Sequence, residues 1–305
     1  MYNTPVVKVA LITEPTGDHL PAYRRVSLCK GIDRLEENPD LASFKPDLAI
    51  ISMEPNNSPP AIERALTAGA HVLTEKPSCT RFEQFERLAR HKDRQIMLAM
   101  ATRLHPDAIS IHKKIASGSL GKLYSVNMIW HADQTRLRNP QYQQTWFAKR
   151  DKSGGGKLIF HGIHYLDLIR FLTGDSITKV TALLNNAGGE AIEVEDSAVV
   201  AMQFASGMTG TLHTGYYLDK GYENTITIWG EKGWVRFDPR KANPPPNMYD
   251  LCLQAAVDFA RGAAPPFMTT EDSLAALSTV FEAYRSAETG VAGLPKQYSA
   301  SALRK

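Results

Sequence analysis

The 305-residue chain has few cysteines and almost no net charge, and each shortage excludes a class of protein. Its three cysteines, Cys29, Cys79 and Cys252, match neither a metal-site nor a disulfide-framework spacing. We therefore expect free thiols in a reducing compartment. The formal net charge of +3 is too close to neutral to indicate binding to nucleic acid or to an anionic membrane.

The sequence also lacks a membrane-length apolar run and the layout of a signal peptide. No stretch is long enough to cross a bilayer, and the first residues run directly into a predicted strand. We therefore expect a cytoplasmic protein. Its hydrophobic content of 43% and charged content of 22% are ordinary for a globular chain of one large domain or two.

The first hundred residues alternate between apolar runs and helical patterns. Four apolar runs, typical of strands covered on both faces, lie at residues 6–13, 45–55, 71–77 and 95–103. Helical patterns at 59–68 and 81–93 separate the last three runs. This alternation predicts an α/β domain over residues 1–102, a Rossmann-like, doubly wound parallel sheet.

The remaining residues, 103–305, have a different pattern. After a predicted helix at 106–122, most segments alternate between apolar and polar side chains, as in a sheet with one covered face. Two helices follow the proline-rich loop at 243–247. This pattern predicts an α+β domain built on a large, mostly antiparallel sheet.

The tripeptide Glu75-Lys76-Pro77 follows the apolar run 71–74, at the expected carboxyl end of a strand. Ligands of open α/β sheets bind at that edge, and a lysine there can protonate or polarise an oxygen atom. The ordinary alternative is a lysine that extends its charged end into solvent. Lys76 is therefore a candidate catalytic residue.

A second motif, residues 154–174, consists of three glycines followed by a predicted helix. His161, His164 and Asp167 are spaced three residues apart and occupy roughly one stripe of this helix. Histidine changes charge near neutral pH, so two histidines facing a cleft would suit proton transfer. Ordinary core histidines and a metal site are the alternatives, but no further ligand cluster supports a metal.

Together these motifs resemble those of the Gfo/Idh/MocA oxidoreductases, which include glucose–fructose oxidoreductase and inositol dehydrogenase. Further segments resemble the family pattern over nearly the whole chain, namely PDLAIISMEPN, AIERALTAGAHVLTEKP and FMTTEDSLAALSTVFEAYRSAETG. The resemblance implies hydride transfer between NAD or NADP and a sugar, cyclitol or related polyol. It also implies a homo-dimer or homo-tetramer.

The resemblance also implies residue roles. Lys76 would orient and polarise the reacting oxygen, and His164 would exchange the proton. The cofactor-binding candidates are Thr13, Gly17, Asn56, Glu75, Lys76 and Pro77. The substrate-binding candidates are Arg103, His131, Asp133, Arg136, Trp146 and Asp167. A mixture of polar and aromatic side chains suits a small polyhydroxylated substrate, although exposed loops have a similar composition.

The proton-transfer motif departs from the family pattern at Phe160, where many members carry an aspartate. Phenylalanine cannot transfer a proton, so His161 becomes a third catalytic candidate. A helix turns about 100° per residue. The side chain of His161 would therefore point elsewhere, unless the backbone there is not helical.

The cofactor-binding end departs further. Residues 13–19 contain one glycine, Gly17, instead of the G-x-G-x-x-G fingerprint, and Glu14 and Asp18 would repel a phosphate. The interval up to Lys45 contains only two predicted helices, near 20–30 and 33–43, with Asp33 capping the second. One strand-and-helix unit, including the acidic residue that binds the ribose, is therefore predicted to be missing. We expect weak cofactor binding with little preference between NAD and NADP.

Two alternatives to a dehydrogenase remain at this point. The first is a catalytically impaired family member that binds a sugar or a partner. The second is a redox-neutral lyase or hydrolase that retains its NAD.

Overall fold

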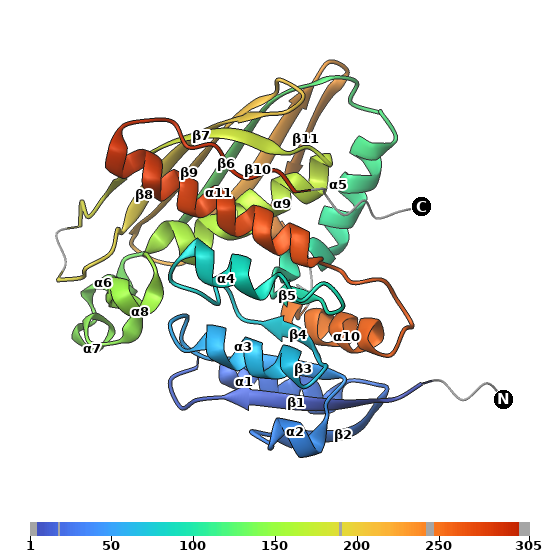
Figure 1. Cartoon of the computed structure of the whole chain (residues 1–305). Coiled ribbons are helices and arrows are strands. Elements are labelled where there is room, and N and C mark those ends of the chain that lie inside the picture. The colour runs from blue at the N-terminus through green and yellow to red at the C-terminus, as the bar shows by residue number, and fades with distance from the viewer. Residues whose placement is uncertain (1–4, 18, 189–190, 242–246, 299–305) are drawn as a thin grey trace. The chain divides into compact units, whose positions relative to one another are not determined.

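The structure, a computed structural model, describes residues 5–17, 19–188, 191–241 and 247–298, except for the side chains of residues 135 and 136. The chain forms two compact units (Figure 1). The first comprises Met1–Leu104 and Pro246–Ser273, and the second comprises His105–Pro245 and Leu274–Lys305. The predicted domain boundary after residue 102 stays a prediction.

The first unit contains a five-stranded parallel sheet with the strand order β2-β1-β3-β4-β5. Its strands are β1 (Val7–Thr13), β2 (Ile32–Glu37), β3 (Leu48–Ser52), β4 (His71–Thr74) and β5 (Ile96–Leu98). The predicted Rossmann-like sheet is confirmed. β1 pairs with β2 on one side and with β3 on the other. The sheet therefore grows in one direction from β1 to β2 and in the opposite direction from β3 onwards. Ligands of such sheets bind at the carboxyl ends of the strands beside this switch point.

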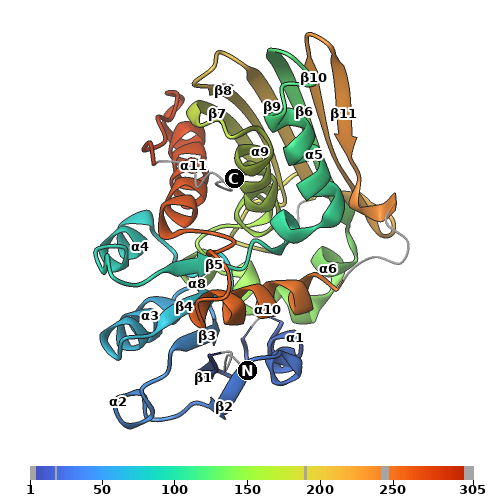
Figure 2. The same ribbon diagram turned by 90° about the vertical axis from the view of Figure 1, so that its right-hand side faces the viewer.

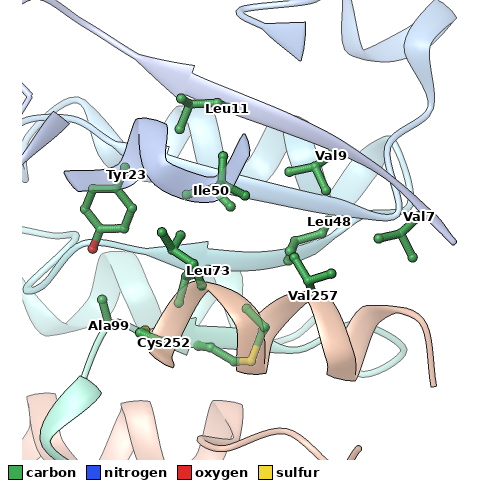
Figure 3. Close-up of a cluster of buried hydrophobic side chains, with 14 residues drawn as sticks. Val7, Val9, Leu11, Tyr23, Leu48, Ile50, Leu73, Ala99, Cys252 and Val257 are labelled. Atoms are coloured by element: carbon green, nitrogen blue, oxygen red, sulfur yellow. The ribbon is translucent and has the colours of Figure 1, made fainter. Parts of the chain in front are cut away.

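Helices cover both faces of this sheet, as the apolar composition of its strands requires. They are α1 (Leu20–Tyr23), α2 (Leu41–Phe44), α3 (Ser58–Thr67), α4 (Phe82–Leu88), α10 (Met248–Ala260) and the 3₁₀ helices Arg24–Leu28 and Ala101–Leu104. Figure 3 shows β-strand residues such as Leu11, Ile50 and Leu73 facing Cys252 and Val257 of α10. The late helix α10 thus completes a core that the first hundred residues begin.

Strand β2 overturns two expectations. Residues 32–37 form a strand instead of a helix, so Asp33 lies within β2 and caps nothing. The helix that follows is capped by Asp40, whose carboxylate accepts the Ser43 N–H at 2.9 Å. The strand beside β1 is therefore present and ends in Glu36-Glu37, although the sheet still has one strand fewer than the six of the common doubly wound order.

The second unit contains a six-stranded sheet in the order β11-β10-β6-β9-β8-β7. Its strands are β6 (Leu123–Asp133), β7 (Ile177–Asn185), β8 (Ser197–Phe204), β9 (Thr209–Leu218), β10 (Tyr222–Gly230) and β11 (Gly233–Phe237). Every neighbouring pair is antiparallel except β6 and β9, which run parallel. The predicted large, mostly antiparallel sheet is confirmed.

The helices of the second unit gather on one face of its sheet (Figure 2). The main ones are α5 (Pro106–Ala116), the π-helix Leu158–Gly162, α9 (Ile163–Thr173) and α11 (Thr270–Thr289). Shorter helices are α6 (Thr135–Arg138), α7 (Pro140–Gln143), α8 (Arg150–Ser153) and the 3₁₀ helices Trp146–Ala148 and Pro239–Lys241. Large apolar side chains such as Leu183, Val199 and Trp234 stay exposed. No helix in the described part of the chain is long and apolar enough to span a membrane.

Candidate active site

Lys76 is buried at the carboxyl edge of the first sheet, directly after β4. It is 7% exposed and the neighbouring Glu75 is 5% exposed, so Lys76 is not the solvated strand-end lysine of the ordinary alternative. The Lys76 Nζ lies 3.7 Å from Glu75 Oε1. The peptide bond to Pro77 is cis. The structure thus supports an ammonium group with a buried carboxylate beside it.

Tyr23, at the end of α1, holds the carboxylate of Glu75 from the other side. Its hydroxyl donates to Glu75 Oε2 at 2.5 Å, while the Lys76 backbone N–H donates to Glu75 Oε1 at 3.0 Å. Burial raises the pKa of Tyr23 well above its ordinary value, and the negative charge of Glu75 raises it further. Sequence reasoning missed Tyr23 because it lies more than fifty residues away in the chain.

Two buried polar atoms follow β3 and β4 and have no hydrogen-bond partner among the described residues. They are Asn56 Oδ1 and the hydroxyl oxygen of Ser78, next to Pro77. A buried polar atom without a partner costs free energy, so such atoms often await a ligand. These two atoms are therefore available to hydrogen-bond a ligand at the carboxyl edge of the first sheet.

Gly17 packs the turn after β1 against the end of β3. The Gly17 N–H donates to the carbonyl of Glu14 at 2.9 Å, which closes the turn. A Cβ atom on Gly17 would lie 2.2 Å from the carbonyl oxygen of Ser52. The turn therefore requires glycine for this close approach to β3.

Glu37 ends β2 beside Thr13, the last residue of β1. The Thr13 hydroxyl donates to Glu37 Oε1 at 3.2 Å, and Arg24 Nη2 lies 2.8 Å from the same oxygen. Hydrogen bonding to Arg24 lowers the pKa of Glu37. Glu37 lies about twenty residues after Gly17, as the ribose-binding acid of a dinucleotide fold does. An acidic residue is therefore present at the end of the strand beside β1, and its binding to a ribose stays a prediction.

A pocket of about 710 Å³ opens beside the loop that follows β2. It is lined by residues of β1, of this loop, of α2 and of α3, among them Ile12, Asn38, Leu41 and Arg64. Its volume lies in the range of ordinary small-molecule sites.

In the second unit, His161 and His164 contact the same indole ring. The ring centroid of Trp130 lies 5.5 Å from that of His161 and 5.4 Å from that of His164. Residues 158–162 form a π-helix, which turns less per residue than an α-helix. His161 points to Trp130 whereas Phe160 points to Trp146, so the two side chains diverge as expected, yet His161 lies beside the same ring as His164. The Trp130 indole N–H is buried and has no hydrogen-bond partner among the described residues.

Phe160 belongs to the core. It is 2% exposed, and its ring lies 5.7 Å from Trp146 and 5.1 Å from Phe147. Trp146 in turn stacks on Phe147 at 3.7 Å. Trp146, a predicted substrate-binding residue, is therefore part of a buried aromatic cluster.

The carboxylate of Glu195 holds the start of the histidine-bearing segment. It accepts the backbone N–H groups of Gly156 and Leu158, both at 2.9 Å, and the Tyr284 hydroxyl at 2.7 Å. A Cβ on Gly155 would lie 2.1 Å from that hydroxyl oxygen. Burial raises the pKa of Glu195. The glycine-rich segment thus binds an internal carboxylate and is not arranged as a phosphate cradle.

Lys157 and Tyr216 extend the histidine cluster. Lys157 is fully buried, and its Nζ lies 4.5 Å from the centre of the Tyr216 ring, a cation–π contact. Tyr216 meets the His161 ring edge-on at 5.8 Å. Sequence reasoning missed Lys157, since an isolated lysine after three glycines carries no distinctive signal.

His131 follows Trp130 in β6 and therefore points to the opposite face of the sheet. Its ring lies 4.8 Å from His213 and 5.1 Å from Tyr217, and its Nδ1 lies 3.6 Å from Glu223 Oε2. Burial and the neighbouring His213 lower the pKa of His131. The structure does not bring His131 to the side of Trp130 where His161 and His164 lie.

The other predicted substrate residues are spread over both units. Asp133 accepts the Gly221 N–H at 3.2 Å and so holds a turn, while Asp167 is buried in α9. In the first unit, Arg103 is buried and forms an ion pair with Asp272 at 3.0 Å. The side chain of Arg136 lies outside the described part of the structure. No group of three or more His, Cys, Asp or Glu side chains that could hold a metal occurs among the described residues.

Comparison with known proteins places the chain among dehydrogenases and reductases. Residues 3–102 match the model "Oxidoreductase family, NAD-binding Rossmann fold", and residues 109–236 match "GFO/IDH/MocA C-terminal domain". The chain is 25% identical to 1,5-anhydro-D-fructose reductase of Ensifer adhaerens over 75% of the chain and 73% of that protein. It is 28% identical to inositol 2-dehydrogenase of Rhizobium meliloti over 67% of the chain and 59% of that protein.

Solved structures show the same fold. The WlbA dehydrogenase from Bordetella pertussis, solved in complex with NADH and UDP-GlcNAcA, superposes with a TM-score of 0.82 at 20% identity. The match covers 96% of this chain and 99% of that one.

Proposed function

Because the chain belongs to the Gfo/Idh/MocA family of oxidoreductases, we propose that it transfers a hydride between a nicotinamide cofactor and a sugar, cyclitol or related polyol. The observation that carries the proposal is the buried pair of Glu75 and Lys76 at the carboxyl end of β4. The named relatives act on an anhydro sugar and an inositol, which supports this substrate class.

Oxidation of an alcohol requires a base for the hydroxyl proton and a cation for the developing alkoxide. We assign the second role to Lys76, whose ammonium Glu75 holds in place. His164 exchanges the proton. His161, which contacts the same indole ring, takes the place of the aspartate that Phe160 does not provide. The bound nicotinamide would supply the hydride chemistry.

The residues of the first unit would hold the cofactor at both ends. Asn56 and Ser78 would hydrogen-bond near the nicotinamide, where their buried polar atoms have no other described partner. Glu37 would bind the ribose hydroxyls, and the pocket beside Asn38 and Leu41 is large enough for an adenosine. A carboxylate at this position would repel the 2′-phosphate of NADP, so NAD is the proposed cofactor.

The substrate would lie against the histidine cluster of the second unit. The buried Trp130 N–H is a hydrogen-bond donor for a substrate hydroxyl. Asp167, Trp146 and Arg103 remain candidates that shape the site from buried positions.

Reduction of NAD in the presence of inositols, aldoses and their derivatives tests the proposal, followed by variants at the two assigned residues. Lys76→Ala and His164→Ala should each lower kcat by roughly two to four orders of magnitude, as expected for a lost acid–base or electrostatic group. Lys92→Ala, at an exposed position, is the control and should leave kcat unchanged. Near-normal turnover of either site variant contradicts the assignment.

A further inference from the structure

Glu14 lies at the switch point of the first sheet, where a dinucleotide fold binds the diphosphate of its cofactor. It follows the last residue of β1, and its side chain reaches across to the segment after β3. There the carboxylate accepts the Asn57 side-chain amide at 2.9 Å and the backbone N–H of Glu54. An anion that belongs to the protein therefore occupies hydrogen-bond donors at this point.

The two donors that Glu14 occupies lie just before α3 and not within its first turn, where Pro59 and Pro60 have no N–H to offer a ligand. Asn57 is the N-cap residue of α3, yet its side chain makes no capping bond to the helix and turns to Glu14 instead. The N-terminus of a helix favours a negative charge. The Glu14 carboxylate thus places a negative charge beside the N-terminus of α3 and satisfies the donors there.

The turn that carries Glu14 is held in this arrangement. Its closing bond from Gly17 to Glu14 and the tight approach of Gly17 to the Ser52 carbonyl pack residues 14–17 onto the end of β3. The helix that follows this turn, α1, offers no second anion site, because it has only four residues and carries Pro21 in its first turn. The Glu14 carboxylate is therefore held in the region where a dinucleotide fold binds the cofactor diphosphate.

We propose that Glu14 is an internal competitor of the cofactor diphosphate and that it sets the affinity of the protein for NAD and NADH. The inference rests on the proposed function. For the diphosphate to bind, the Glu14 carboxylate must leave Asn57 and Glu54, and its charge repels the incoming phosphates. Weak binding of both redox forms makes NAD an exchanging co-substrate. It disfavours a redox-neutral lyase or hydrolase that retains its cofactor.

Calorimetric titration of the full chain with NAD and with NADH tests this inference. The central variant is Glu14→Gln, which keeps the side-chain shape and an acceptor for the Glu54 N–H but removes the charge. We expect it to bind both nucleotides about tenfold more tightly than the unmodified protein, or better, because one close repulsion is lost. Glu14→Ala should bind more tightly as well, since the donors are then vacant.

Glu83→Gln is the matched control. It removes one negative charge from an exposed position of the same unit, in α4. A gain in affinity equal to that of Glu14→Gln would mean a general charge effect and would overturn the inference. Unchanged or weaker binding by both Glu14 variants, with thermal unfolding showing that they are folded, would overturn it too.

Inorganic pyrophosphate separates this inference from the proposed function. If no variant binds NAD or NADH at millimolar concentration, the proposed function fails. Pyrophosphate that binds Glu14→Ala but not the unmodified protein would then still show that Glu14 occupies an anion site. Binding of neither probe by Glu14→Ala would refute the competition.

Discussion

Removal of the Tyr23 hydroxyl tests the hydrogen bonds that hold Glu75 beside Lys76. Tyr23 is 1% exposed and donates to the buried Glu75 carboxylate at 2.5 Å. Tyr23→Phe removes this bond and keeps the ring that packs in the core. A hydrogen bond to a charged group contributes about 1.5–3 kcal/mol. We expect the free energy of unfolding of the first unit to fall by about that amount near neutral pH.

The expected loss depends on pH in a defined direction. Burial and Glu75 raise the pKa of Tyr23 in the folded protein, whereas the unfolded chain keeps the ordinary value of about 10. The contribution of protonated Tyr23 to the free energy of unfolding is fully present below about pH 10. Above that pH it falls by about 1.4 kcal/mol per pH unit. Phenylalanine does not titrate. The difference between Tyr23→Phe and the unmodified protein should therefore shrink by about 1.4 kcal/mol at about pH 11.

Urea unfolding followed by circular dichroism, with reductant present, measures both effects. Tryptophan fluorescence is unsuitable because all four tryptophans lie in the second unit. Tyr222→Phe, at a 51% exposed position, is the control and should change nothing. Tyr284→Phe, which loses the equivalent bond to Glu195, should behave like Tyr23→Phe in the second unit. A loss below about 0.5 kcal/mol, or one that is equal at both pH values, would refute the reasoning.

Two further predictions concern cofactor choice and assembly. Glu37→Ala should reduce the preference for NAD over NADP by about tenfold, the size of one lost charge interaction, and unchanged nucleotide affinities would exclude Glu37 from the ribose site. The protein should be a dimer or tetramer, because Leu183, Val199 and Trp234 leave apolar surface on the second sheet uncovered. Sedimentation should show Trp234→Glu shifting it towards the 33.7 kDa monomer, and a monomeric unmodified protein would contradict the prediction.

Local patterns predicted most of the fold but not β2. Its residues Leu35, Glu36 and Glu37 are good helix formers, and its two apolar residues, Ile32 and Leu35, are three positions apart, a spacing typical of a helix. What makes this segment a strand is its parallel pairing with β1. Because that pairing joins residues about twenty-five positions apart, a reading of neighbouring residues cannot detect it.

Sequence reasoning could identify candidate site residues where a reactive side chain lies within a short sequence motif, as Lys76 and His164 do. The groups that hold those residues come from distant segments. Tyr23 reaches Glu75 across 52 positions, and Tyr284 reaches Glu195 across 89. Each is an ordinary tyrosine in sequence. Only burial and a shared carboxylate give it a role.

The π-helical turn explains how the family aspartate can be absent while two histidines face one ring. A π-helix accommodates an extra residue per turn, so the side chain at position 160 rotates into the aromatic cluster around Trp146. There a carboxylate would be buried without water, and phenylalanine packs well. The same turn keeps His161 beside Trp130, next to His164. Under the proposed mechanism, the proton-exchanging group would have moved by one residue along the chain, so the substitution at Phe160 would not by itself abolish catalysis.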